Sequence, residues 1–67
     1  MKSLTLIHLD GRKFATARFP DCGMNRWPWV QETVAREFDC DCDDVTAEAD
    51  EDNEFVAVGG VRVARIG

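Results

Sequence analysis

Apolar and polar residues alternate over residues 4–9 and again over residues 14–19, which is the pattern of strands with one buried face. The dipeptide Asp10-Gly11 lies between the two runs, and Asp-Gly in that position is typical of a tight β-hairpin turn. We therefore expect an antiparallel hairpin with a two-residue turn. The side chains expected on its helix-facing side are Leu4, Leu6, Ala15, Ala17 and Phe19.

Further along the chain, the spacing of apolar residues changes to that of a helix. The predicted apolar stripe consists of Trp27, Val30, Val34 and Phe38. Pro28 suits the start of a helix, because the N–H groups of the first turn have no partner within the helix. These features predict one helix near residues 27–40.

Three more strands are expected after the helix. Residues 45–49 alternate apolar and polar, and the apolar runs 55–58 and 61–66 are separated by Gly59-Gly60, a second tight-turn signal. The pairs expected from that turn are Val56 with Val63, Val58 with Val61 and Glu54 with Arg65. The predicted fold is α+β, in the order β-β-α-β-β-β. Residues 1–67 are expected to form a single compact domain with the helix packed on an antiparallel sheet of four or five strands.

One helix covers only one face of such a sheet. In the expected register, the face away from the helix carries Ile7, Leu9, Phe14, Phe55 and Ile66. These side chains bury one another if the strands curl, and otherwise form an apolar patch open to a partner. Trp29 lies off the apolar stripe, so it either packs against the 20–26 loop or acts as an interface anchor. The candidate apolar contact residues are Trp29, Phe14 and Phe55.

The charge is distributed unevenly along the chain, whose net charge is −5. Residues 39–54 contain nine acidic residues and no basic one, whereas the other residues include eight basic and four acidic ones. A phosphate backbone requires a basic footprint, so direct binding to nucleic acid is disfavoured. The residues expected to contact a basic surface on a protein partner are Asp39, Asp41, Asp43, Asp44, Glu48, Asp50, Glu51 and Asp52.

The sequence FDCDCDD, residues 38–44, contains potential metal ligands. Cys40, Cys42, Cys22 and His8 are of the types that bind zinc. However, Cys22 precedes the expected helix and Cys40 ends it, and about 13 helical residues span about 20 Å. Ligands of one zinc ion must converge on it, so we expect no zinc and three free thiols.

The same stretch also has the spacing of the first calcium ligands of an EF-hand at Asp39, Asp41 and Asp43. Asp44 stands where that loop needs glycine, and Asp50 stands where it needs glutamate. An EF-hand is therefore not predicted. The interpretation favoured for this stretch is a helix end and first turn on a solvated acidic edge.

Little in the sequence suggests catalysis. The chain has one histidine, one serine and no tyrosine, and none of them stands in a recognisable nucleophile–base motif. We expect a protein that is not an enzyme, with no catalytic residue and no cofactor.

The composition also indicates in which cellular compartment the protein is expected. No apolar run approaches the roughly 20 residues of a membrane helix, and the start MKSLTLIHLDG lacks the pattern of a signal peptide. An odd number of cysteines fits a reducing compartment better than a disulfide scaffold. We expect a cytoplasmic protein without membrane contact.

In size and in the acidic run 39–54, the chain resembles the small acidic inhibitors that phages and mobile elements encode, including anti-CRISPR proteins. The resemblance implies a stoichiometric blocker that docks on the basic surface of a nucleic-acid-binding complex. Three alternatives remain open. The acids only keep a small host protein in solution, or the chain is a homodimeric assembly component that uses the apolar sheet face, or it is a metal-binding accessory protein that uses Cys40 and Cys42.

Overall fold

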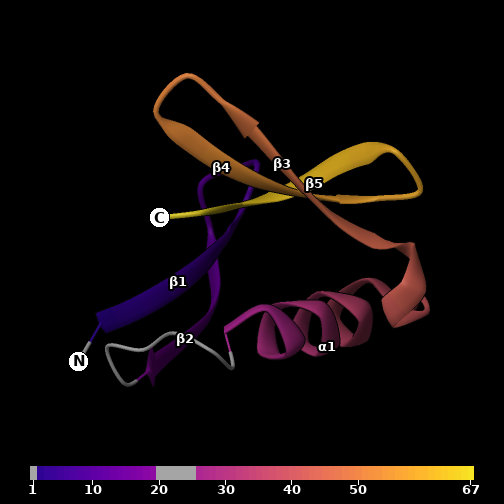
Figure 1. Ribbon diagram of the computed structural model, residues 1–67, viewed down its shortest axis with the longest axis horizontal. Helices are drawn as coiled ribbons and strands as arrows, with labels where there is room; N and C mark the ends of the chain where they lie inside the picture. The colour runs from indigo at the N-terminus through magenta and orange to yellow at the C-terminus, as the bar shows by residue number, and fades with distance from the viewer. Residues whose placement is uncertain (1, 20–25) are drawn as a thin grey trace.

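The computed structural model describes residues 2–19 and 26–67. One helix, one short 3-10 helix and five strands follow one another in the predicted order (Figure 1). They are β1 (Lys2–His8), β2 (Lys13–Phe19), α1 (Arg26–Phe38), η1 (Cys42–Asp44), β3 (Val45–Asp50), β4 (Asn53–Val58) and β5 (Val61–Ile66). The prediction of an α+β fold with a single helix on an antiparallel sheet is confirmed.

The five strands form one sheet in the order β2-β1-β5-β4-β3, and every neighbouring pair is antiparallel. The two hairpins are joined through β1 and β5, which leaves β2 and β3 as the edges of the sheet. The helix lies across one face of the sheet, below it in the view of Figure 1. Among residues 2–19 and 26–67, no helix lies on the other face.

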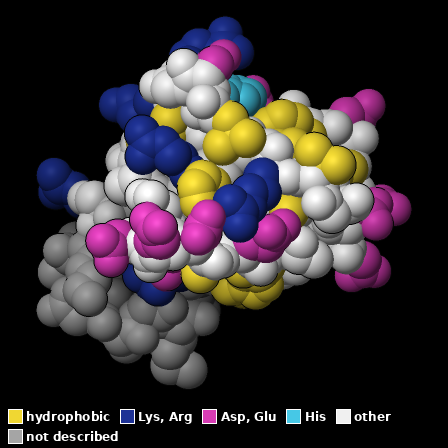
Figure 2. Space-filling view, turned by 90° about the horizontal axis from the view of Figure 1, so that it is seen from above, with side chains coloured by type: hydrophobic (Ala, Val, Ile, Leu, Met, Phe, Trp, Pro, Cys, Tyr) yellow, Lys and Arg dark blue, Asp and Glu magenta, His cyan; other side chains and the backbone are white. Residues whose placement is uncertain are grey.

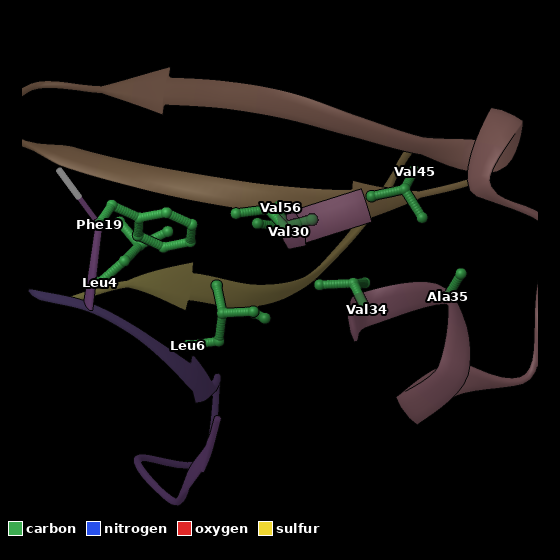
Figure 3. Packing of buried hydrophobic residues seen from close by; sticks show 9 residues of the cluster. Leu4, Leu6, Phe19, Val30, Val34, Ala35, Val45 and Val56 are labelled. Atoms are coloured by element: carbon green, nitrogen blue, oxygen red, sulfur yellow. The ribbon is translucent and has the colours of Figure 1, made fainter. Parts of the chain in front are cut away.

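The core lies between α1 and the helix-facing side of the sheet. Val30 and Val34 of the helix are buried against Leu6 and Val56 of the central strands (Figure 3). Fully burying a side chain of this kind stabilises the fold by about 1.5–3 kcal/mol. The remaining buried members of the cluster are Leu4, Phe19, Ala35, Val45 and Ala64.

The first hairpin has the predicted pairing near its open end but not near its turn. Leu6 pairs with Ala15 as predicted, yet Ile7 pairs with Lys13, so Phe14 is an extra residue in β2. This β-bulge changes the alternation, because two residues of one strand then oppose one residue of its neighbour. Phe14 packs on the helix side, with its ring centroid 6.1 Å from that of Phe38. The prediction that Phe14 lies on the face away from the helix is wrong.

The second hairpin contains a similar irregularity. Val58 pairs with Val61 as predicted, but Val56 pairs with Ala64, so Val63 is an extra residue in β5. The shift continues to the end of the strand, where Ile66 pairs with Glu54 and packs against the core cluster. The predicted pairs Val56–Val63 and Glu54–Arg65 are wrong for this reason, and so is the placement of Ile66 away from the helix.

The helix ends in a Schellman motif centred on Asp39. The N–H of Cys40 donates to the carbonyl oxygen of Ala35 at 2.9 Å, and Asp39 has a φ of 52°. Glycine is the residue best suited to this left-handed position, because a Cβ atom clashes there with the following carbonyl. The carboxylate of Asp39 also lies at the negative end of the helix dipole. Asp39 is thus unfavourable for stability on two grounds.

Replacing Asp39 with glycine should therefore stabilise the protein. We expect the D39G variant to raise the free energy of unfolding by about 1–2 kcal/mol, because relief of the left-handed strain and loss of the misplaced charge together outweigh the extra entropy that glycine loses on folding. The control is Asp39→Asn, which keeps the side-chain size and removes only the charge, for a gain of about 0.3–1 kcal/mol. Urea unfolding of the three proteins measures both effects. A D39G variant less stable than wild type would show that Asp39 does not strain the helix end.

Candidate partner-binding surface

Nine carboxylates lie along one margin of the molecule, and we call them the acidic band. Its members are Asp39, Asp41, Asp43, Asp44, Glu48, Asp50, Glu51, Asp52 and Glu54. They lie in the segment that joins α1 to the 3-10 helix η1, in η1 itself, in the edge strand β3, in the turn after it and at the start of β4. All are exposed except Glu48, which is half-buried. Most of these residues lie in segments whose backbone position is fixed by regular hydrogen bonds.

The sheet order separates the acidic band from the basic residues of β2. β3 forms one edge, whereas Lys13 and Arg18 belong to β2 at the opposite edge. Four strand spacings of about 4.8 Å place the two edges about 19 Å apart. Figure 2, which looks from above onto β3, β4 and β5, shows acidic side chains mainly along its lower and right margins and basic ones mainly toward the upper left. The uneven charge of the sequence becomes a charge separation in space.

Arg62 of β5 neutralises part of the acidic band. Its guanidinium lies 3.1 Å from Oε1 of Glu48 and 3.5 Å from Oδ2 of Asp50. The same group lies over the ring of Phe55, 4.5 Å from the ring centroid, a cation–π contact. The hydrogen bond with Glu48 raises the pKa of Arg62 above its already high ordinary value. Glu48 and Asp50 are thus partly satisfied within the protein, although both were expected to serve a partner.

The role of Arg62 is not evident from the sequence. Its contact with Glu48 crosses β4, so it depends on the order β5-β4-β3 and on the bulge that sets which side of β5 faces outward. The two adjacent hairpins indicate that strand order, but the bulge has no sequence signal. No ion pair between described side chains involves the other seven acids of the band.

The three candidate apolar contact residues do not form one surface. Phe14 and Trp29 line a shallow depression of about 300 Å³ beside the helix. Trp29 is half-buried and packs edge-to-face on Phe19, with ring centroids 5.5 Å apart. Phe55 stands on the other face of the sheet, beneath Arg62. The apolar patch expected on that face is therefore reduced, because Phe14 and Ile66 belong to the helix side.

Three other large apolar residues are more exposed than those predicted. Leu9 in the first turn is 52% exposed, Val61 in the second hairpin is 66% exposed and Trp27 is 37% exposed. Trp27 was expected on the buried stripe of the helix. Instead, it borders a cleft of about 330 Å³ between the start of α1 and the sheet, which Val30, Ala47, Ala49 and Ile66 also line.

The His8 side chain is packed among aromatic rings and hydrogen-bonded to the helix. Its ring packs against those of Phe14 and Phe38, with centroid distances of 4.6 and 5.4 Å. Its Nε2 lies 3.0 Å from Oε1 of Glu37 on the helix. His8 thus lies between the first hairpin and the end of the helix. No nucleophile is seen beside it among the described residues.

The cysteines that the structure describes are free thiols. Cys40 is half-buried and Cys42 is exposed, and Cys22 lies outside the described residues. Desolvation raises the pKa of the Cys40 thiol, and the nearby carboxylates, chiefly Asp44 and Asp41, raise it further. Within residues 2–19 and 26–67, no three His, Cys, Asp or Glu side chains are grouped so that they could hold a metal ion.

Comparison with known proteins found no matching family model, no matching curated protein and no matching solved structure. In the part of the chain that the structure describes, no helix has the length and apolar character needed to cross a membrane. The function is therefore inferred from the surface of this protein alone.

The environment of Cys40 gives a testable pH dependence. A raised pKa lowers the thiolate fraction at a given pH, so iodoacetamide should modify Cys40 only at higher pH than it modifies the exposed Cys42. Replacing Asp41 and Asp44 with asparagine should shift the Cys40 profile to lower pH, because two repulsive charges are removed. Peptide mass mapping over a pH series follows each thiol separately. Equal modification of both at every pH would contradict this assignment.

Proposed function

We propose that this protein is a non-enzymatic binding protein whose acidic band docks on a basic, nucleic-acid-binding surface of a partner protein. The observation that carries the proposal is that nine carboxylates share one margin and that Arg62 alone pairs with any of them among the described side chains. Like charges held together cost stability, and a partner with positive charge relieves that cost.

The way the acidic band is built supports docking more than solubility. Solubility needs only a net charge, which scattered or flexible acids provide equally well. Here six of the nine acids lie on an edge strand, a 3-10 helix and a tight turn, so their spacings are fixed before a partner arrives. Preorganised charge lowers the entropic cost of binding and speeds a correctly oriented encounter. A nucleic-acid backbone also presents negative charge at regular spacings, so the acidic band can compete for the same groove.

The proposed mechanism is stoichiometric blocking, as in the small acidic inhibitors of phages and mobile elements, among them anti-CRISPR proteins. In this mechanism the protein contacts no nucleic acid itself and needs no cofactor. Its partner is a protein whose basic groove normally holds DNA or RNA.

The test compares two variants that change the net charge equally at different places. The band variant carries Asp43→Asn, Asp44→Asn and Asp52→Asn, and leaves Glu48 and Asp50 in place for Arg62. The control carries Asp10→Asn, Glu32→Gln and Glu37→Gln, which are acids outside the acidic band. We expect the band variant to bind a partner captured from lysate of the source cells about tenfold more weakly, and the control to bind like wild type.

Binding is measured at low and at physiological salt. The wild-type affinity should fall as salt screens the charges, and the band variant should show a flatter dependence. Equal affinity and equal salt slope for the band variant and wild type would overturn the proposal. In that case the alternative is a homodimer through the helix-free face of the sheet. Sedimentation would then show a dimer mass for wild type and a lower mass for a Phe55→Ser variant.

A further inference from the structure

The edge strand β3 has backbone groups directed away from the sheet. The turn after β3 closes with the pair Asp50–Asn53, and the N–H of Gly59 donates to the carbonyl oxygen of Asp44 at 3.1 Å. In an antiparallel ladder, hydrogen-bonded pairs alternate along the strand. The even-numbered residues of β3 therefore bond to β4, and Ala47 and Ala49 point their N–H and C=O groups to the open side. The described residues place no further strand there.

The helix-facing side of this edge is incompletely filled, with small apolar side chains on β3 itself and Arg26 and Glu54 at the border of the cleft. Ala47 and Ala49 are exposed and border the cleft of about 330 Å³ beneath Trp27. Figure 3 shows β3 at the margin of the sheet, where Val45 at its start is the labelled core residue that it contributes. An extra strand beside β3 would carry the side chains opposite the two alanines on this same side, at the mouth of the cleft.

The opposite side of the same edge is acidic. Thr46, Glu48 and Asp50 alternate with the alanines and lie on the helix-free face, where Arg62 reaches two of them from within the sheet. The chain thus already uses an arginine to match these carboxylates. A basic side chain on a strand next to β3 would approach them from the side that Arg62 leaves open.

We propose that β3 accepts an extended segment of the partner protein as an additional antiparallel strand, and that this segment alternates basic and apolar residues. Its apolar side chains lie over Ala47 and Ala49 toward Trp27, and its basic side chains face Glu48 and Asp50. This inference rests on the proposed function, since it states how the basic partner engages the acidic band. Strand addition of this kind takes its affinity from backbone hydrogen bonds and its specificity from alternate side chains.

The acidic edge also selects against the wrong occupants. Two copies of β3 side by side would bring their carboxylates together, and like charges directly opposite one another are destabilising. Charged residues on an edge strand commonly serve to prevent such pairing. On β3 the same carboxylates favour a strand of opposite charge. The residues that prevent pairing with a second copy of β3 are thus the ones that select a basic strand.

The probe is a blocked peptide of alternating arginine and valine that matches the six residues of β3 in length. Two further peptides carry backbone N-methyl groups. In the first peptide every valine is N-methylated, and in the second every arginine is N-methylated. In the proposed register the valines lie opposite Ala47 and Ala49, and their N–H groups face β3. Methylation of the valines should weaken binding about tenfold or more, because those hydrogen bonds are lost, whereas methylation of the arginines should change it little.

Binding is followed by nuclear magnetic resonance of the labelled protein, which also reports amide exchange. The parent peptide should slow exchange at Ala47 and Ala49. If both methylated peptides bind like the parent, the contact is electrostatic only, which overturns strand addition and leaves the proposed function standing. If the arginine-methylated peptide alone fails, the antiparallel register is wrong and the proposal fails. Concentration-dependent self-association that protects Ala47 and Ala49 without peptide would make a second copy the occupant, and would also overturn it.

Discussion

The structure depends on the packing of a single helix against a sheet that is wider than the helix can cover. The 13 residues of α1 span about 20 Å, and a helix with its side chains is about 10–12 Å across. The sheet extends about 19 Å from β2 to β3. Burial is therefore complete in the middle, at Leu6, Val34 and Val56. It is incomplete at the β3 edge, where Ala47 and Ala49 stay exposed and the cleft under Trp27 opens.

The same constraint explains the helix-free face. No second helix covers it in the described part of the chain, so Phe55 needs another partner, and Arg62 provides one by lying over its ring. The guanidinium can take that position because Glu48 and Asp50 hold its outer side. Arg62 thus covers the apolar ring of Phe55 and also pairs with two carboxylates. A face organised by arginine in this way is less suited to apolar self-association than the sequence suggested.

The sequence predicted the elements well, because the signals for them are local. Asp10-Gly11 and Gly59-Gly60 mark turns, and the helical spacing of Val30 and Val34 marks the helix. The two bulges were not predictable, since an extra residue in a strand is set by the fit of side chains across the whole sheet. Phe14 joins the aromatic group of His8 and Phe38, and this packing accompanies the irregular register of β2. The residues of the acidic band were predicted, but the position of β3 as an edge strand of the sheet was not, because it depends on the strand order.

The position of the acidic band argues that it was retained for something other than folding. Asp39 occupies a left-handed position that glycine would fill more favourably, and it stands at the pole of the helix where a carboxylate is unfavourable. Asp41, Asp43 and Asp44 follow directly and add negative charge around the half-buried Cys40, whose pKa Asp41 and Asp44 help to raise. The left-handed backbone of Asp39 and the clustering of carboxylates at the helix end each cost some stability, and a small domain has little to spare. A partner that brings positive charge to this edge would offset that cost upon binding, which is the physical reason to look for function there.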